Sequence, residues 1–418
     1  MKFYIDKIKN SSLEDKTYFV WGIYIFICFL NAVGIIFVND KCQTVLKLVR
    51  YICYIAFAIK SFDDWRKGEK ITLSIIGMFI LSIAIAVVAK NRSIFFMTLV
   101  LVGLRKMDFD KLIKIALKIF MISFAIVISL ALLGIIPNWK FSRGAEPRYA
   151  LGFIYATDAI GMYLIIILMY LYIKKNTLTN KELFFLQIIN IFMYSYTDGR
   201  MSFILISLVL FLQFISKYEF AKNIFYKEIV QKTLGKICNT LPIILFLGLH
   251  ILVFMYANDN FIAKKADTLL SSRIRYTYQA YRKNDIGLLG SDIEWNGWGA
   301  YGYTGEESDE DFKYNFVDSS YASIVFDYGL VFSCIVILGY RHILITNLKK
   351  ENYWLVFTIL FILLWSFIEQ HIINLGKNVF VLSFIPLLDI GEIKKMEYKN
   401  LKKILKKTKN YKNIWRTL

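Results

Sequence analysis

The residues best suited to chemistry lie in one polar segment, SSRIRYTYQAYRKNDIGLLGS, at residues 271–291. It contains Arg273, Arg275 and Arg282, with Tyr276 among the neighbouring rings. A guanidinium group is planar and permanently charged, and it can bind a carboxylate or a phosphate through two parallel hydrogen bonds. The segment therefore predicts an anion-binding site, although any single loop arginine is more often a surface ion-pair partner than a ligand.

Four other polar segments combine cations with groups that can accept a proton. They are NWKFSRGAEPRYALGF (138–153), YTDGRMSF (196–203), NFVDSS (315–320) and FIEQHIINLGKN (367–378). A positioned carboxylate or imidazole can take a proton from a hydroxyl group during a reaction. The candidates in these segments are the cations Arg143, Arg148, Arg200 and Lys377 and the bases Asp318, Glu369 and His371.

The composition is that of an integral membrane protein. The 418 residues are 57% hydrophobic and only 20% charged, the mean hydropathy is +0.49, and apolar runs of about 20 residues recur throughout. Barrel-like alternation is absent, so backbone polarity requires spanning helices. The net charge of +19 reflects lysines between and after apolar runs, which indicates membrane anchoring rather than nucleic-acid binding. The five cysteines show no CxxC spacing, and we expect no metal or other cofactor.

The apolar runs predict an all-α polytopic protein with about twelve transmembrane helices. Residues 1–256 hold the first nine spans, 257–320 form one large loop, 321–390 hold three more spans, and 391–418 form a basic tail. The predicted spans are 17–38, 43–62, 71–89, 93–104, 111–136, 149–173, 183–196, 200–216, 238–256, 321–340, 353–369 and 377–390.

The distribution of basic residues predicts which loops lie on which side. With the N-terminus inside, every inner segment carries Lys or Arg, as the positive-inside rule requires. The loop at 257–320 then lies outside and has roughly four more acids than bases. Both termini are expected in the cytosol, with the tail against the anionic inner leaflet. All five segments named above then face outward, where basic residues are less expected and where a ligand would account for them.

These outer segments resemble those of the Wzy-type polysaccharide polymerases, which belong with the O-antigen ligases. RYALGFIYATDAIG looks like the family's outer arginine before a polar span entry, and YTDGRMSFI looks like its Thr-x-x-Arg turn. RIRYTYQAYRKNDIGLLG is similar to the arginine-to-glycine stretch of the large outer loop. NFVDSSYASIVFDYGLV resembles the return of that loop into the membrane. Ligases place a histidine near this point, whereas this chain has Asp318, which favours a polymerase.

The resemblance implies a GT-C-like enzyme of the bacterial cytoplasmic membrane. Such enzymes transfer a growing glycan from polyprenyl pyrophosphate to the next lipid-linked repeat on the outer face. Partners would be the lipid-linked donor and acceptor, membrane lipids, and flippase and chain-length regulator proteins. Arginines would hold the pyrophosphate and stabilise its developing charge. We expect Arg148, Arg200 and Arg275 in this role, with Arg143, Arg273 and Arg282 beside them.

The acceptor hydroxyl needs a base or an orienting carboxylate, and Asp318, Glu369 and His371 are the candidates. Tyr276 could support a sugar ring, although an interfacial aromatic belt predicts the same residue types. Tyr321, one helical turn beyond Asp318, is expected to support it. Asp158 is the one acid well inside an apolar run and is expected to pair with Arg148 or Arg200.

Alternative functions remain open at this point. An O-antigen ligase would share the fold and differ in the acceptor. A lipid-linked oligosaccharide flippase would have a similar length, but it would show internal repeats and short loops. A membrane O-acyltransferase would need a cytosolic histidine, and only His342 is available. The run EESDEDFK contains Asp309 and Asp311 in a DxD pattern, which we interpret as a solvated acidic tip rather than a metal site.

Overall fold

The computed structural model describes residues 12–143, 146–297 and 315–389, and helices account for most of them. In chain order the α-helices are α2 (Leu13–Leu30), α3 (Gly34–Phe37), α4 (Asp40–Arg66), α5 (Leu73–Val88), α6 (Ser93–Gly103), α7 (Phe109–Leu132), α8 (Ala156–Lys174), α9 (Asn180–Thr197), α10 (Arg200–Ile215), α11 (Glu219–Phe225), α12 (Glu228–Ala257), α13 (Phe261–Leu269), α14 (Arg273–Lys283), α15 (Ser320–Lys349) and α16 (Tyr353–Trp365). Two 3-10 helices, η1 (Lys175–Thr177) and η3 (Val379–Asp389), complete the helical part.

Five of these helices are long and apolar enough to cross a membrane, or up to six if the bent pair α10 and α11 counts as one span. The architecture is therefore that of an all-α membrane protein. The count of twelve spans is not confirmed, because α6 has 11 residues, α16 has 13 and η3 has 11. An 11-residue α-helix is only about 16 Å long, against a hydrocarbon core of about 30 Å.

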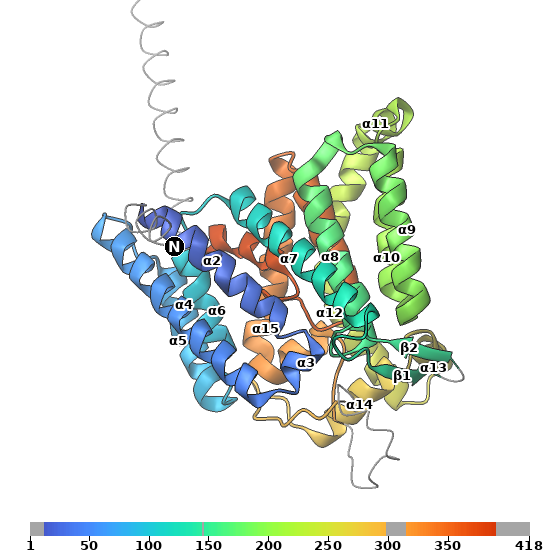
Figure 1. The fold of residues 1–418 in the computed structure, drawn as a ribbon, viewed down its shortest axis with the longest axis horizontal. Helices are drawn as coiled ribbons and strands as arrows, with labels where there is room; N and C mark the ends of the chain where they lie inside the picture. The colour runs from blue at the N-terminus through green and yellow to red at the C-terminus, as the bar shows by residue number, and fades with distance from the viewer. Residues whose placement is uncertain (1–11, 144–145, 298–314, 390–418) are drawn as a thin grey trace, which may run out of the picture.

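The segments predicted to lie outside the membrane gather at one end of the helix bundle. Figure 1 shows the β-hairpin, α13 and α14 at the lower end of the view and α11 at the opposite end. Contacts between segments that are far apart in the chain also join residues at the same end of the bundle. The lower end contains the contacts Val33–Phe153, Lys90–Asp292, Arg148–Thr197 and Arg273–Glu369, and the other end contains Arg105–Asp389, Thr72–Leu388 and Tyr172–Asp110. Which end faces the cytoplasm stays a prediction.

The large loop predicted at 257–320 is partly helical. It begins with α13 and α14, which pack against each other and against α12. Asn260 caps α13 through hydrogen bonds from the next backbone amides, and Asp267 accepts a bond from the Arg275 amide at 2.9 Å. The predicted loop between spans 111–136 and 149–173 contains a hairpin of β1 (Lys140–Arg143) and β2 (Glu146–Tyr149). The acidic run at 306–313 and the basic tail lie outside the described residues.

Two helices form the centre of the bundle and carry residues of the site. Helix α8 packs against α7, α9, α10 and α16, and nearly all its side chains are buried. Helix α16 is similarly buried and contacts α8, α10, α12 and α15. Both helices are therefore packed mainly against other helices of the bundle.

Helix α15 is interrupted at Gly329, where the backbone adopts φ 84° and ψ 170°. The break leaves backbone N–H and C=O groups of α15 without partners in the helix, and loop 287–291 forms hydrogen bonds with them. Leu330 N donates to Gly287 O at 3.3 Å, Val331 N to Leu288 O at 3.2 Å, and Ser291 N to Phe326 O at 2.9 Å. The loop is therefore inserted beside the helix, which fixes residues 315–328 relative to α14.

We expect cysteines introduced at Gln279 and Asn223 to lie on opposite sides of the membrane, since α14 and α11 occupy opposite ends of the bundle. Both positions are exposed. In a background with the five native cysteines replaced, an impermeant thiol reagent should label residue 279 in intact cells and residue 223 only after permeabilisation. Equal labelling of both would contradict this arrangement, and the inverse pattern would reverse the topology.

Replacing Gly329 with Ala should destabilise the protein. The added Cβ would clash with backbone atoms of Leu288 and Gly290, and its φ lies in a region that side chains avoid. We expect a loss of roughly 1–3 kcal/mol, seen as a lower melting temperature in detergent. Gly248→Ala is the matched control, because nothing lies within 4 Å of the Cβ it would add. A Gly329→Ala variant as stable as this control would contradict the close packing of loop 287–291 against Gly329.

Candidate functional site

Arg273 is the centre of an ion-pair network that joins three chain segments. Its Nε donates to Asp318 Oδ2 at 3.2 Å, and its Nη2 donates to Glu369 Oε1 at 3.0 Å. The three side chains are 15%, 29% and 18% exposed, respectively. Nη1 makes no hydrogen bond to the described residues, so one edge of the guanidinium group is available to a further acceptor. The network thereby links the start of α14, the entry to α15 and the loop after α16.

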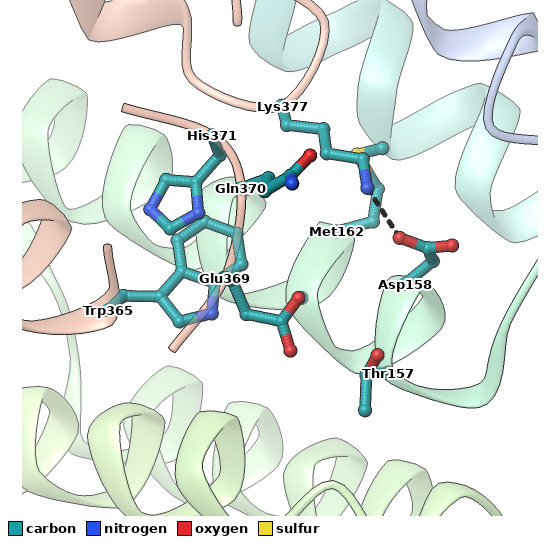
Figure 2. A pocket seen from close by; sticks show the side chains of 9 residues that line it. Thr157, Asp158, Met162, Trp365, Glu369, Gln370, His371 and Lys377 are labelled. Atoms are coloured by element: carbon teal, nitrogen blue, oxygen red, sulfur yellow. Dashed lines mark hydrogen bonds and ion pairs between the residues drawn. The ribbon is translucent and has the colours of Figure 1, made fainter. Parts of the chain in front are cut away.

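A second ion pair lies beside the first. Lys377 Nζ is 2.6 Å from Asp158 Oδ1, which comes from the first turn of α8. Figure 2 shows this pair and the Glu369 carboxylate around one small pocket. Its lining residues come from the start of α8, the end of α16 and the following loop, and they are Thr157, Asp158, Gly161, Met162, Trp365, Glu369, Gln370, His371 and Lys377.

The surroundings of Glu369 alter the proton affinity of its carboxylate. Burial raises the pKa of Glu369 to about 7, the positive charge of Arg273 opposes that rise, and the negative charge of Asp318 adds to it. A carboxyl group with a pKa near neutrality can both accept and release a proton under physiological conditions. Glu369 is therefore the carboxyl group here that is best matched to proton transfer.

The loop that carries Glu369 is held by the first residue of α15. The Ser320 hydroxyl donates to the Glu369 carbonyl oxygen and accepts from the backbone amides of His371 at 2.9 Å and Ile372 at 3.2 Å. These bonds satisfy backbone groups that would otherwise be unpaired in a buried loop. They also fix the distance between Glu369 and Asp318, which lies two residues before Ser320.

His371 is buried against Trp365 and is only 2% exposed. The two rings are stacked with centroids 3.5 Å apart, and Nε2 lies 3.2 Å from Ser366 Oγ. Burial lowers the pKa of His371 well below its ordinary value, so the ring is neutral at physiological pH. Its Nδ1 has no hydrogen-bond partner among the described residues. His371 thus lines the pocket as a neutral side chain.

Arg148 and Arg200 have different environments. Arg148 is 5% exposed and its Nε donates to Thr197 O at 2.8 Å. Its guanidinium carbon is 5.7 Å from the ring centre of Tyr155, which is also within electrostatic reach of Arg273. Arg200 is 63% exposed and pairs with Asp198 at 3.1 Å. The tight turn at Asp198 and Gly199 places Gly199 directly against Ile160 of α8.

Several other residues predicted for the site form no bond to the Arg273 network among the described residues. Arg275 and Arg282 are exposed, and at about 100° per residue they are roughly opposite Arg273 on α14. Tyr276 is half-buried with the Arg275 guanidinium 5.2 Å from its ring centre.

Tyr321 is fully buried and its hydroxyl donates to Leu363 O at 2.8 Å, so it packs α15 against α16. Arg143 occupies the end of β1, in register with Glu146.

The prediction that Asp158 pairs with Arg148 or Arg200 was wrong, since its partner is Lys377. Lys377 was among the candidate cations of the outer segments and Asp158 was singled out as a buried acid, but their pairing with each other was not predicted. Their sequence signal was an acid near the start of one span and a lysine just before another. Charge alone could not show that the partner of Asp158 is Lys377 rather than Arg148 or Arg200, because all three cations were predicted on the same side of the membrane.

Comparison with known proteins finds no matching family model, no matching curated protein and no matching solved structure. The interpretation of the site therefore depends on its geometry and on the resemblance of its motifs.

Arg273→Gln should lower the melting temperature, because it leaves two carboxylates without their shared cation. The loss should be greater at about pH 8.5 than at about pH 5.5, since Glu369 is ionised above its pKa of about 7. Adding Glu369→Gln should restore part of the stability, with a coupling of roughly 0.5–3 kcal/mol. Arg275→Gln on the same helix is the control. Equal effects of Arg273→Gln and Arg275→Gln would contradict the ion-pair network.

Proposed function

We propose that the protein is a polymerase of lipid-linked oligosaccharide repeats, a metal-independent glycosyltransferase that uses a polyprenyl-pyrophosphate donor. The single observation that supports this most is the Arg273–Asp318–Glu369 network. It joins three of the segments whose motifs resemble those of Wzy-type polymerases. The other two such segments carry Arg148, which donates to Thr197 O, and Arg200, which pairs with Asp198.

The donor phosphates would bind along a row of cations. Nη1 of Arg273 would donate to a phosphate oxygen, while Asp318 and Glu369 keep the guanidinium group oriented. Arg148 and the exposed Arg200 would contact the same pyrophosphate. Each charge-assisted hydrogen bond contributes roughly 1.5–3 kcal/mol, so two or three of them would hold the donor at the membrane surface. Arg275 and Arg282, on the opposite face of α14, are not part of this proposed site.

Glu369 would act as the base. It would take the proton of the acceptor sugar hydroxyl as that oxygen attacks the anomeric carbon of the donor glycan. The bond between this carbon and the phosphate oxygen breaks, and the pyrophosphate leaves with the electron pair. Arg273 stabilises the developing negative charge. Glu369 is preferred to Asp318 because it lines the pocket. Asp318 would position Arg273.

Purified protein in proteoliposomes, supplied with polyprenyl-pyrophosphate-linked repeats, tests this proposal. Glu369→Gln should lower the polymerisation rate about 100-fold or more, while donor binding is retained. Asp318→Asn should reduce the rate less and should weaken donor binding, because it loosens the orientation of Arg273. Polymerisation at wild-type rate by Glu369→Gln would exclude Glu369 as the base. Lys41→Gln on α4, which replaces an exposed cation outside the proposed site, is the control for loss of positive charge.

The wild-type rate should also depend on pH. A base must be unprotonated, so the rate should rise with pH through about 7 and fall on acidification below it. The measurement is the initial rate between about pH 5.5 and pH 8.5 with saturating donor. A rate independent of pH across this range would contradict the role of Glu369 while leaving the donor site untouched.

A further inference from the structure

Helix α14 has a second basic surface, which faces away from Arg273. Arg275, Tyr278, Gln279 and Arg282 recur at intervals of three or four residues and therefore share one face of the helix. With Lys283 and with Tyr256 of α12 they line one open hollow. Among the described residues no carboxylate lines it, and neither Arg275 nor Arg282 forms an ion pair with any of them. The hollow is therefore a cationic and aromatic site.

The position of Tyr256 places this hollow at the edge of the membrane. Helix α12 exposes an apolar stripe, Ile244, Leu247, Ile251 and Phe254, with 48–72% of each side chain accessible. The spacing of three or four residues gives a single lipid-facing stripe, and Tyr256 lies just beyond its last member. Tyrosine is enriched where the hydrocarbon ends and the headgroups begin. The hollow thus lies at the depth of the lipid phosphates.

Helix α13 supports the same placement. Its Phe261, Ile262 and Leu269 are 77%, 64% and 74% exposed, whereas Ala263 and Asp267 on its other side are buried. A short helix with an exposed apolar face next to a transmembrane helix fits the membrane interface, where that face enters the acyl region. Helix α13 follows α12 after three residues and packs against it, so its exposed apolar face lies close to the end of α12.

We infer that the surface formed by Arg275, Arg282 and Lys283 with Tyr256 and Tyr278 binds the phosphate of an anionic phospholipid in the leaflet at this end of the bundle. The two guanidinium groups supply bidentate donors for the phosphate. The apolar face of α13 accommodates the adjoining acyl chains. The bound lipid fixes the depth of α14 and hence of Arg273, which begins that helix. This inference does not depend on the proposed enzymatic function.

Native mass spectrometry of the detergent-purified protein, titrated with phosphatidylglycerol, tests the inference. The wild type should retain one tightly bound lipid that Arg275→Gln/Arg282→Gln binds about tenfold more weakly or not at all. The control is Lys41→Gln/Lys47→Gln on α4, which removes the same charge from two exposed side chains. Melting curves in phosphatidylcholine should be the same for wild type and both variants, because the four replaced side chains are exposed.

Three results would overturn the inference. One is unchanged lipid binding by the arginine variant. Another is an equal loss in the lysine variant, which would indicate a general effect of net charge. The last is displacement of phosphatidylglycerol by an equal concentration of inorganic phosphate, which would identify a site for a free anion. Retention of phosphatidylglycerol against inorganic phosphate, combined with loss in the arginine variant alone, would establish the lipid as the ligand.

Discussion

The arrangement of this end of the molecule depends on one guanidinium group. Arg273 bonds Asp318 and Glu369 at the same time, and these carboxylates belong to segments that are far apart in the chain. Two carboxylates that are mostly withdrawn from water repel each other unless a cation lies between them. The position of Arg273 at the start of α14 therefore determines where α15 enters the bundle and where the loop after α16 can lie.

The helices around Arg273 are built to maintain that position. Asp267 bonds the Arg275 amide in the first turn of α14, and Ser320 bonds the backbone on both sides of Gln370. Loop 287–291 fills the break in α15 at Gly329, so the segment that bears Asp318 is supported on a second side. The segments that carry Arg273, Asp318 and Glu369 are thus fixed by hydrogen bonds from short side chains to the backbone, as in other preorganised sites.

The sequence predicted the grouping of the outer segments but not their detailed geometry. The basic residues of short loops assigned the segments to two sets, and those sets occupy opposite ends of the bundle. The ranking of the arginines of α14 stays a prediction; it was made with residues 271–291 interpreted as a loop, whereas Arg273–Lys283 form a helix. The buried positions Ile274, Thr277 and Ala280 alternate with the exposed Arg275 and Arg282 at helical spacing, and this pattern would have predicted one inward arginine. The Asp158–Lys377 pair and the short helices depend on tertiary packing, which hydropathy does not encode.

The most direct test of the central claim is the set of lipid-linked intermediates that accumulates in a strain lacking this gene. Our account predicts polyprenyl-pyrophosphate carriers that bear a single repeat unit on the outer face of the membrane, with no longer chains. Full-length chains retained on the lipid carrier would instead identify a ligase. Single repeats confined to the cytosolic face would identify a flippase, and either result would contradict a polymerase built around Arg273.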